Sequence, residues 1–155
     1  FHKQELGMIE YKRLTAGDKK KKKNLVRIFR NQNPSDEKVL LALNDPTIYL
    51  YVALLEDDVC GYVKAYRLKR FDEENDFFLV YHCFVQEKYR RMHIAHNLMK
   101  MILDEAQAAN AYYTFLITQS DNAPAMRLYE ELGGYNHPKN KEVFYWYPEG
   151  KTPHG

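Results

Sequence analysis

The chain has 155 residues, of which 45% are hydrophobic and 28% are charged, and its formal net charge is +2. This length is sufficient for one hydrophobic core, and the composition excludes a disordered chain. The near-neutral charge does not indicate wholesale nucleic-acid binding or a strongly cationic substrate.

The cysteine content and the hydropathy indicate the cellular setting. Cys60 and Cys83 are too few for a disulfide framework, and no segment approaches the ~20 apolar residues of a membrane-spanning helix. We therefore expect a cytoplasmic protein with no membrane partner. We also expect a single domain over residues 8–148. Residues 1–7 would be an extraneous segment that is foreign to the native chain, and residues 149–155 a flexible tail.

The first part of the domain predicts one strand and two helices. Residues 8–14 alternate apolar and polar side chains, as a strand does, and Asp18 is placed to begin a helix that ends near Asn31. The lysine run 19–23 is interpreted as a solvated face of this helix, because the residues after it supply an apolar face. A polyanion-binding site is the alternative. A second, short helix is expected to end near Asn44.

Three apolar runs then predict an antiparallel meander, at residues 48–55, 59–68 and 77–85. The third run is apolar on both faces apart from His82, so we expect a central strand that is covered on both sides. Alternation along this strand places Tyr81 and His82 on opposite faces.

The second half predicts alternating helices and strands. Apolar residues recur at helical spacing from Met92 to about Asn110, and an apolar strand follows at residues 112–118. A strand, helix and strand in this order form a right-handed crossover with parallel strands, and ligands bind at the carboxyl ends of such strands. The remaining predicted elements are a helix that Asn122 caps and Gly133 and Gly134 end, and a last strand at residues 143–147.

The turn after the third apolar run is the most informative segment. Residues 80–95 read as a buried strand, a short basic turn and an amphipathic helix. A helix start presents unpaired N–H groups and the positive end of the helix dipole. Because Arg90 and Arg91 flank the turn, we predict that it binds a phosphate or pyrophosphate; an exposed and inert arginine pair is the alternative.

Two sequence blocks resemble a known family. Residues 90–95, Arg-Arg-Met-His-Ile-Ala, are similar to the (Gln/Arg)-x-x-Gly-x-(Gly/Ala) segment of the GNAT family of N-acetyltransferases. Residues 122–133 match its Asn-x-x-Ala-x-x-Leu-Tyr-x-x-x-Gly block. The resemblance covers roughly residues 8–147. At one position the chain departs from the pattern, because His93 replaces the first glycine, and this departure bears on cofactor affinity.

The resemblance implies an α/β fold of the GNAT type. Its central, mixed and twisted sheet would have six to seven strands flanked by about four helices, with two parallel strands splayed at the cofactor site. The implied co-substrate is acetyl-CoA, with no metal. Its pantetheine arm would pair with the backbone of Cys83, Phe84 and Val85 and pass near Asn122. The residues implied around its pyrophosphate are Arg90, Arg91, Met92, His93, Ile94, Ala95 and His96.

The resemblance also implies catalytic roles. Tyr129 stands at the general-acid tyrosine of the family, where it would protonate the departing thiolate; the alternative is a tyrosine that packs a helix on the sheet. His82 stands where aminoglycoside 3-N-acetyltransferases, which the chain also resembles, carry an aspartate in Asp-Leu-Ala-Val. A neutral imidazole there would accept the proton of the amine, and a buried core histidine is the alternative. Cys83 has no paired base in the sequence and is not expected to be a nucleophile.

The sequence leaves the acceptor open between small-molecule and peptide amines. The acidic residues 72–76 would attract a cationic amine, such as a polyamine, an aminoglycoside or a peptide N-terminus, or would serve only solubility. We predict an N-acetyltransferase in which a primary amine attacks acetyl-CoA directly in a ternary complex. No nucleic-acid partner is expected, and a homodimer is compatible with the resemblance. The alternatives are an aminoglycoside-type antibiotic acetyltransferase, a silent coenzyme A-binding module, and a nucleic-acid or ribosome-associated protein that uses the lysine run.

Overall fold

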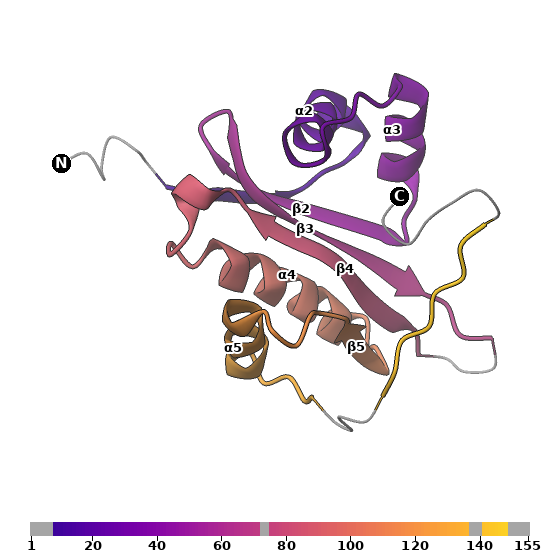
Figure 1. Ribbon diagram of the computed structural model, residues 1–155. Helices are drawn as coiled ribbons and strands as arrows, with labels where there is room; N and C mark the ends of the chain where they lie inside the picture. Colours follow the sequence, from indigo (N-terminus) through magenta and orange to yellow (C-terminus); the bar gives the residue numbers. More distant parts are fainter. Residues whose placement is uncertain (1–7, 72–74, 137–140, 149–155) are drawn as a thin grey trace.

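The computed structural model describes residues 8–71, 75–136 and 141–148 (Figure 1). Its strands are β1 (Glu10–Arg13), β2 (Ile48–Leu55), β3 (Asp58–Leu68), β4 (Phe77–Val85) and β5 (Tyr113–Leu116). Its helices are α2 (Lys19–Arg30), α3 (Asp36–Asn44), α4 (Ile94–Ala108) and α5 (Ala123–Glu131), with short 3-10 turns η1 (Ala16–Asp18) and η2 (Glu87–Tyr89). The expected extraneous segment, 1–7, and the expected tail, 149–155, lie outside the described residues.

The strands form one mixed sheet in the order β1-β2-β3-β4-β5. Neighbours from β1 to β4 are antiparallel, and β4 and β5 are parallel. The predicted meander and the predicted parallel pair are therefore confirmed, as are the predicted bounds of β2 and β4.

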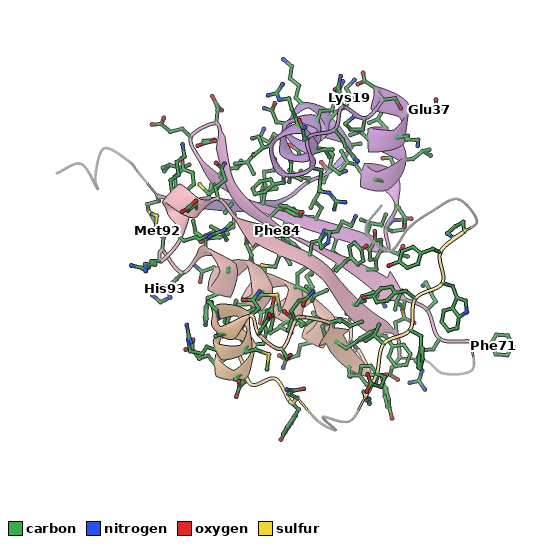
Figure 2. The ribbon with its side chains drawn as sticks, viewed as in Figure 1. Lys19, Glu37, Phe71, Phe84, Met92 and His93 are labelled. Atoms are coloured by element: carbon green, nitrogen blue, oxygen red, sulfur yellow. The ribbon has the colours of Figure 1, made fainter. Side chains whose placement is uncertain are left out.

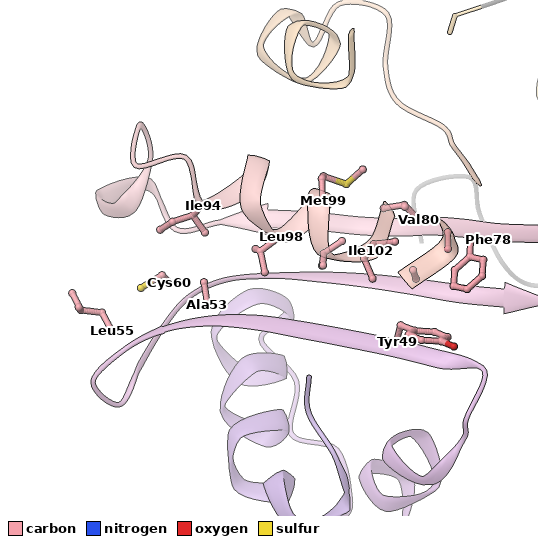
Figure 3. Close-up of a cluster of buried hydrophobic side chains, with 13 residues drawn as sticks. Tyr49, Ala53, Leu55, Cys60, Phe78, Val80, Ile94, Leu98, Met99 and Ile102 are labelled. Atoms are coloured by element: carbon pink, nitrogen blue, oxygen red, sulfur yellow. The ribbon is translucent and has the colours of Figure 1, made fainter. Parts of the chain in front are cut away.

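Helices cover both faces of the sheet, with α2 and α3 on one and α4 and α5 on the other (Figure 1). The α2-face cluster includes Leu25, Leu50, Val52, Leu54 and Tyr62. The α4-face cluster includes Phe78, Val80, Ile94, Leu98 and Ile102 (Figure 3). The α4 members recur every four residues, so they form one buried stripe on that helix. Among the helices within the described ranges, none is long and apolar enough to cross a membrane.

Side-chain caps explain where two of the helices begin. The Ser35 side chain accepts from the Lys38 N–H at 3.3 Å before α3, and the Asn122 side chain accepts from the Ala125 N–H at 3.2 Å before α5. Gly133 follows α5 with φ 88°, a left-handed conformation that glycine adopts without steric cost. The predicted capping role of Asn122 is confirmed.

Two predictions about the sheet are wrong. The described residues form five strands rather than six to seven, and residues 143–147 do not form a strand. The side chains in that segment are exposed, Trp146 by 85%. Its aromatic residues favour a strand, but a strand also needs a neighbouring edge to pair its backbone. Within the described residues this segment pairs with no such edge.

A bulge in β4 overturns the prediction that Tyr81 and His82 lie on opposite faces. Ala65 of β3 pairs with Val80 and Lys64 pairs with His82, so Tyr81 is an extra residue in β4. The Tyr81 and His82 rings lie 4.4 Å apart between centroids, and both are on the α2 face. This face of β4 is also less covered than predicted, since Tyr81 remains 53% and Phe84 46% exposed.

Candidate functional site

β4 has an open edge at its carboxyl end. β5 pairs with β4 only from Phe77 to Val80, so β4 continues from Tyr81 to Val85 without β5. On its other side β4 stays paired with β3 as far as Val85. The two parallel strands therefore separate at the place where the sequence predicted a splayed pair.

Backbone groups of this open edge can pair with a ligand, although the Val85 carbonyl already accepts a hydrogen bond from Arg90 Nε. The Gln86 N–H donates to the Cys60 carbonyl of β3 at 2.7 Å. Because backbone groups alternate in direction along a strand, those of Phe84 point to β3, whereas those of Cys83 and Val85 point to the open side. An extended ligand can pair with these groups as a strand would.

The turn after β4 is held against the start of β3. The Gln86 side chain donates to the Val59 carbonyl, and the Tyr89 hydroxyl donates to the Asp58 carboxylate. Lys88 Nζ lies 3.3 Å from the same carboxylate. The hydrogen bond from Tyr89, with the charge of Lys88, lowers the pKa of Asp58, so these contacts persist at neutral pH. They fix η2 and thereby the start of α4.

The start of α4 has backbone N–H groups that precede the first hydrogen bond of the helix. The first intrahelical bond runs from the Asn97 N–H to the His93 carbonyl at 3.0 Å, and the His93 side chain makes no cap. The N–H groups of Ile94, Ala95 and His96 precede this bond in the first turn of the helix. Met92 lies beside His93 at the exposed tip of the turn (Figure 2).

Arginine side chains surround this helix start. Arg90 and Arg91 are both exposed, and Arg90 Nε donates to the Val85 carbonyl at 3.3 Å, so it links the turn to the open edge of β4. Arg91 and His93 have left-handed backbones, with φ 66° and 58°. The conformation at His93 gives the physical reason for a glycine there, because glycine adopts positive φ without strain and histidine adopts it at some cost. Sequence reasoning did not single out the strain at Arg91.

α5 brings Tyr129 to the α4 side of the open edge. Tyr129 and Cys83 pack, both partly buried, against the α4-face cluster. Burial raises the pKa of Tyr129, and the neighbouring Cys83 raises it further, so the hydroxyl remains a proton donor at neutral pH. Burial also raises the pKa of the Cys83 thiol to about 12, which argues against a thiolate nucleophile. Asn122 is exposed at the start of α5, and none of its described contacts reaches β4.

His82 lies on the opposite, α2 face of β4. Its Nδ1 atom is 3.3 Å from Nη1 of Arg30. A guanidinium only donates, so Nδ1 accepts and the neutral ring carries its proton on Nε2. Burial lowers the pKa of His82, and the charges of Arg30 and Lys64 lower it further. The imidazole is therefore neutral at pH 7, with its one free lone pair engaged by Arg30.

Described residues of both charged segments of the sequence form ion pairs within the protein. Lys19 and Lys23 lie 3.1 Å and 2.9 Å from the Asp36 carboxylate. In the acidic segment, residues 72–74 lie outside the described residues, and the Asp76 carboxylate accepts from Arg67 Nε at 2.7 Å. Asp76 is thus neutralised by an ion pair rather than free to attract a cationic amine.

Sequence reasoning missed three residues that shape this site: Tyr89, Arg30 and Gly61. Only Gly61 carried a usable signal, because a glycine inside a strand pattern often marks a close backbone approach. A Cβ atom at Gly61 would lie 2.6 Å from the Phe84 carbonyl oxygen. The contacts of Tyr89 and Arg30 join segments that are distant in the sequence, at separations of 31 and 52 residues.

Comparisons with known proteins agree with this geometry. A model of the acetyltransferase (GNAT) family matches residues 20–134. No curated protein matches the chain by sequence. An aminoglycoside acetyltransferase from an uncultured soil metagenomic sample, solved with trehalose, is similar in structure with a TM-score of 0.76. It is 22% identical, and the match covers 90% of this chain and 95% of that one.

Two further solved structures are similar. Aminoglycoside N-acetyltransferase AAC(6')-Iy in complex with CoA has a TM-score of 0.71 at 12% identity, over 92% of this chain and 95% of that one. Ribosomal-protein-alanine N-acetyltransferase from Brucella melitensis biovar Abortus 2308 has a TM-score of 0.68 at 18% identity, over 89% of this chain and all of the other, 100%. At these identities the likeness shows a shared fold.

Proposed function

Because the chain belongs to the acetyltransferase (GNAT) family, we propose that it transfers an acetyl group from acetyl-CoA to a primary amine, by direct attack with both substrates bound. One observation carries this proposal. The open backbone edge at Cys83 and Val85, the N–H groups at the start of α4 and the Tyr129 side chain, which neighbours Cys83, support it together at the carboxyl end of β4.

The residues present fit coenzyme A. The first-turn N–H groups of α4, with the exposed Arg90 and Arg91, suit a diphosphate. The outward backbone groups of Cys83 and Val85 suit an extended, amide-bearing arm. When bound, acetyl-CoA would supply the activated acyl group.

Two side chains hold or accept protons in this proposal. Tyr129 keeps its proton at the hydroxyl oxygen, because its pKa is raised, and donates it to the departing thiolate. His82 can accept the proton of the amine only at Nδ1, so Arg30 must first leave that atom. The free thiols of Cys60 and Cys83 support a reducing, cytoplasmic location.

Two related candidates remain distinct from this proposal. An aminoglycoside acceptor is supported by the names of similar structures. A silent coenzyme A-binding module is supported by His93, which puts a side chain and strain where the family has glycine.

Replacement of Tyr129 by phenylalanine tests the main proposal. We expect Tyr129→Phe to lower kcat about 100-fold, as the loss of a general acid does, with the Kd for CoA unchanged. Thiol release from acetyl-CoA across an amine panel measures the rate, and calorimetry measures the Kd. Tyr135→Phe is the matched control, because that side chain is 95% exposed.

Two results would contradict the proposal. A Tyr129→Phe variant as active as the Tyr135→Phe control would remove the general acid. CoA binding without thiol release for any amine would instead select the silent module.

A further inference from the structure

The α2 face of the sheet carries a basic and aromatic surface that the proposed mechanism uses only at His82. We call it the basic face and define its members as the charged Lys22 and Arg30 of α2, the charged Lys64 of β3 and the neutral His82 of β4. Lys64 Nζ lies 5.3 Å from the ring centroids of both Tyr66 and Tyr81. The aromatic side chains along this face are Tyr62, Tyr66, Tyr81 and Phe84.

A pocket opens beside the basic face, between α2, α3 and the sheet. Its volume is about 90 Å³, and its charged lining residues are Lys22 and Lys64. The rest of its lining is Leu14, Ala42, Leu43, Ile48, Leu50 and Tyr66. The side chains of Lys22 and Lys64 thus line the same pocket, and most of its other lining residues are apolar.

These like charges lack a compensating carboxylate. Burial lowers the pKa of Lys22, and the charge of Lys64 lowers it further. Within the described part of the chain, the ion pairs do not involve Lys22, Arg30 or Lys64. An anion placed between Lys22 and Lys64 would relieve their mutual repulsion.

The basic face adjoins the carboxyl end of β4. Phe84 and His82 lie on this face, with ring centroids 5.3 Å apart, whereas Cys83 between them packs with Tyr129 on the other side. α4 and α5 already cover that other side (Figure 1). An acceptor that reaches the open edge of β4 therefore approaches along the basic face.

We propose that the acceptor amine carries an anionic group, a carboxylate or a phosphate, on an aromatic or apolar body. The anion lies between Lys22 and Lys64, the body lies along Tyr66, Tyr81 and Phe84, and the amine reaches the open edge of β4. This inference rests on the proposed function and names the substrate class of the same site. A polycationic aminoglycoside would bring positive charge to a positive surface.

Matched amines test the inference. 4-(Aminomethyl)benzoate and 4-methylbenzylamine share an aromatic ring and a primary amine. They differ only in that a methyl group replaces the carboxylate in the second compound. We expect kcat/KM to be about tenfold higher for the acid, in line with a hydrogen-bonded ion pair. The Lys22→Gln/Lys64→Gln double variant should bring this ratio close to one, whereas Lys20→Gln, an exposed lysine of the same helix, should keep it. Thermal unfolding confirms that each variant is folded.

A second measurement does not depend on turnover. 4-Methylbenzoate has no amine, and we expect calorimetry to show that it binds the wild-type protein and the Lys20→Gln control but not the double variant. The phosphonate analogue of 4-(aminomethyl)benzoate distinguishes a carboxylate from a phosphate. Whichever of these two compounds has the higher kcat/KM identifies the anion that the pocket binds.

The outcomes separate this inference from the proposed function. A ratio of one or less in the wild-type protein, a preference for a polycationic aminoglycoside, or a preference that survives the double substitution overturns the inference and leaves acetyl transfer standing. Specific binding of 4-methylbenzoate without acetylation of any amine supports the anion site and overturns the proposed function.

Discussion

The backbone of His93 is left-handed, with φ 58° and ψ 21°, at the residue before α4 begins. For a residue with a Cβ atom this conformation costs about 1–2 kcal/mol, although histidine adopts it more readily than most. The side chain is exposed and makes no cap, and its ring contacts only that of His96 among the described aromatic pairs, at 6.3 Å between centroids, so little offsets the strain. The turn at residues 90–93 therefore stores strain at the residue that precedes the first-turn N–H groups of α4.

We expect His93→Gly to retain or raise stability, by up to about 1 kcal/mol, because relief of strain offsets the added freedom of the unfolded chain. His93→Val should lower stability by about 1–2 kcal/mol, because a β-branched residue fits this conformation poorly. Thermal unfolding measures both effects, and calorimetry should show tighter CoA binding for His93→Gly.

Met92→Gly is the neighbouring control for the glycine effect. Met92 is exposed and is not among the residues with positive φ. Glycine there only adds chain freedom, so it should destabilise. Equal losses from His93→Gly and Met92→Gly would show that position 93 carries no strain.

Residue-level prediction succeeded where local chemistry decides. The family pattern singled out position 93 as a glycine site, and the structure has positive φ there. The environment of His82 could not be predicted from the local sequence. Its partner Arg30 is 52 residues away, and only the packing of α2 on the sheet brings the two together.

At the scale of elements, Gly61 controls how closely β3 approaches the open end of β4. A Cβ atom there would lie 2.6 Å from the Phe84 carbonyl oxygen and 3.1 Å from Val85 Cα. Both contacts are with backbone, which cannot rotate away. We expect Gly61→Ala to cost about 1–3 kcal/mol, as overpacking does, and to weaken CoA binding because Val85 is displaced.

Thermal unfolding and CoA titration of Gly61→Ala measure these effects, with Gly17→Ala as control. A Cβ atom at Gly17 would meet nothing within 4 Å. If the two alanine variants matched in both stability and affinity, β3 would not be the element that sets the position of Val85.

Tyr89 links η2, in the turn after β4, to β3 through the Asp58 carboxylate. Because the Asp58 side chain is 40% exposed, the bond contributes less than is usual for a charged acceptor, about 1 kcal/mol. We expect Tyr89→Phe to lose about this much stability and to raise the Kd for CoA several-fold, since η2 can then shift the start of α4.

Tyr135→Phe serves again as control for Tyr89→Phe. Unchanged CoA affinity in the Tyr89→Phe variant, despite a lower Tm, would mean that α4 keeps its position without this tie.

Element bounds were predictable because they follow local periodicity, as β2 and β4 show. The bulge at Tyr81 was not predictable, because it depends on the pairing of β4 with β3. One extra residue turns His82 and Phe84 toward α2 and leaves Cys83 and Val85 with the α4-face cluster. The site thus depends on a register that the strand's own sequence does not encode.

At the scale of the whole molecule, the sheet separates two apolar clusters. The proposed general acid and the proposed acceptor site lie on opposite sides of this sheet. The α4 side carries Tyr129, and the α2 side carries the basic face. The sequence predicted the first side through the family resemblance. It did not predict the second, because Lys22, Arg30 and Lys64 come from separate segments and share no motif.

Two aspartates with lowered pKa values, Asp58 and Asp76, predict how the stability of the protein changes in acid. The hydrogen bond and charge of Arg67 lower the pKa of Asp76, and Tyr89 and Lys88 lower that of Asp58. A carboxyl with a lowered native pKa binds fewer protons in the folded than in the unfolded chain. Its contribution is therefore present above the unfolded value of ~3.9 and is lost as the pH falls toward the native value.

We accordingly expect a free energy of unfolding that falls steeply with pH below about 4, and a smaller slope in Asp76→Asn, which removes one of these groups. Denaturant unfolding at a series of pH values measures the slope. Asp121→Asn, at an exposed position before α5, is the control and should follow the wild-type curve. The same slope in Asp76→Asn as in the wild-type protein would mean that the Arg67–Asp76 pair does not link the start of β4 to the acid stability of the fold.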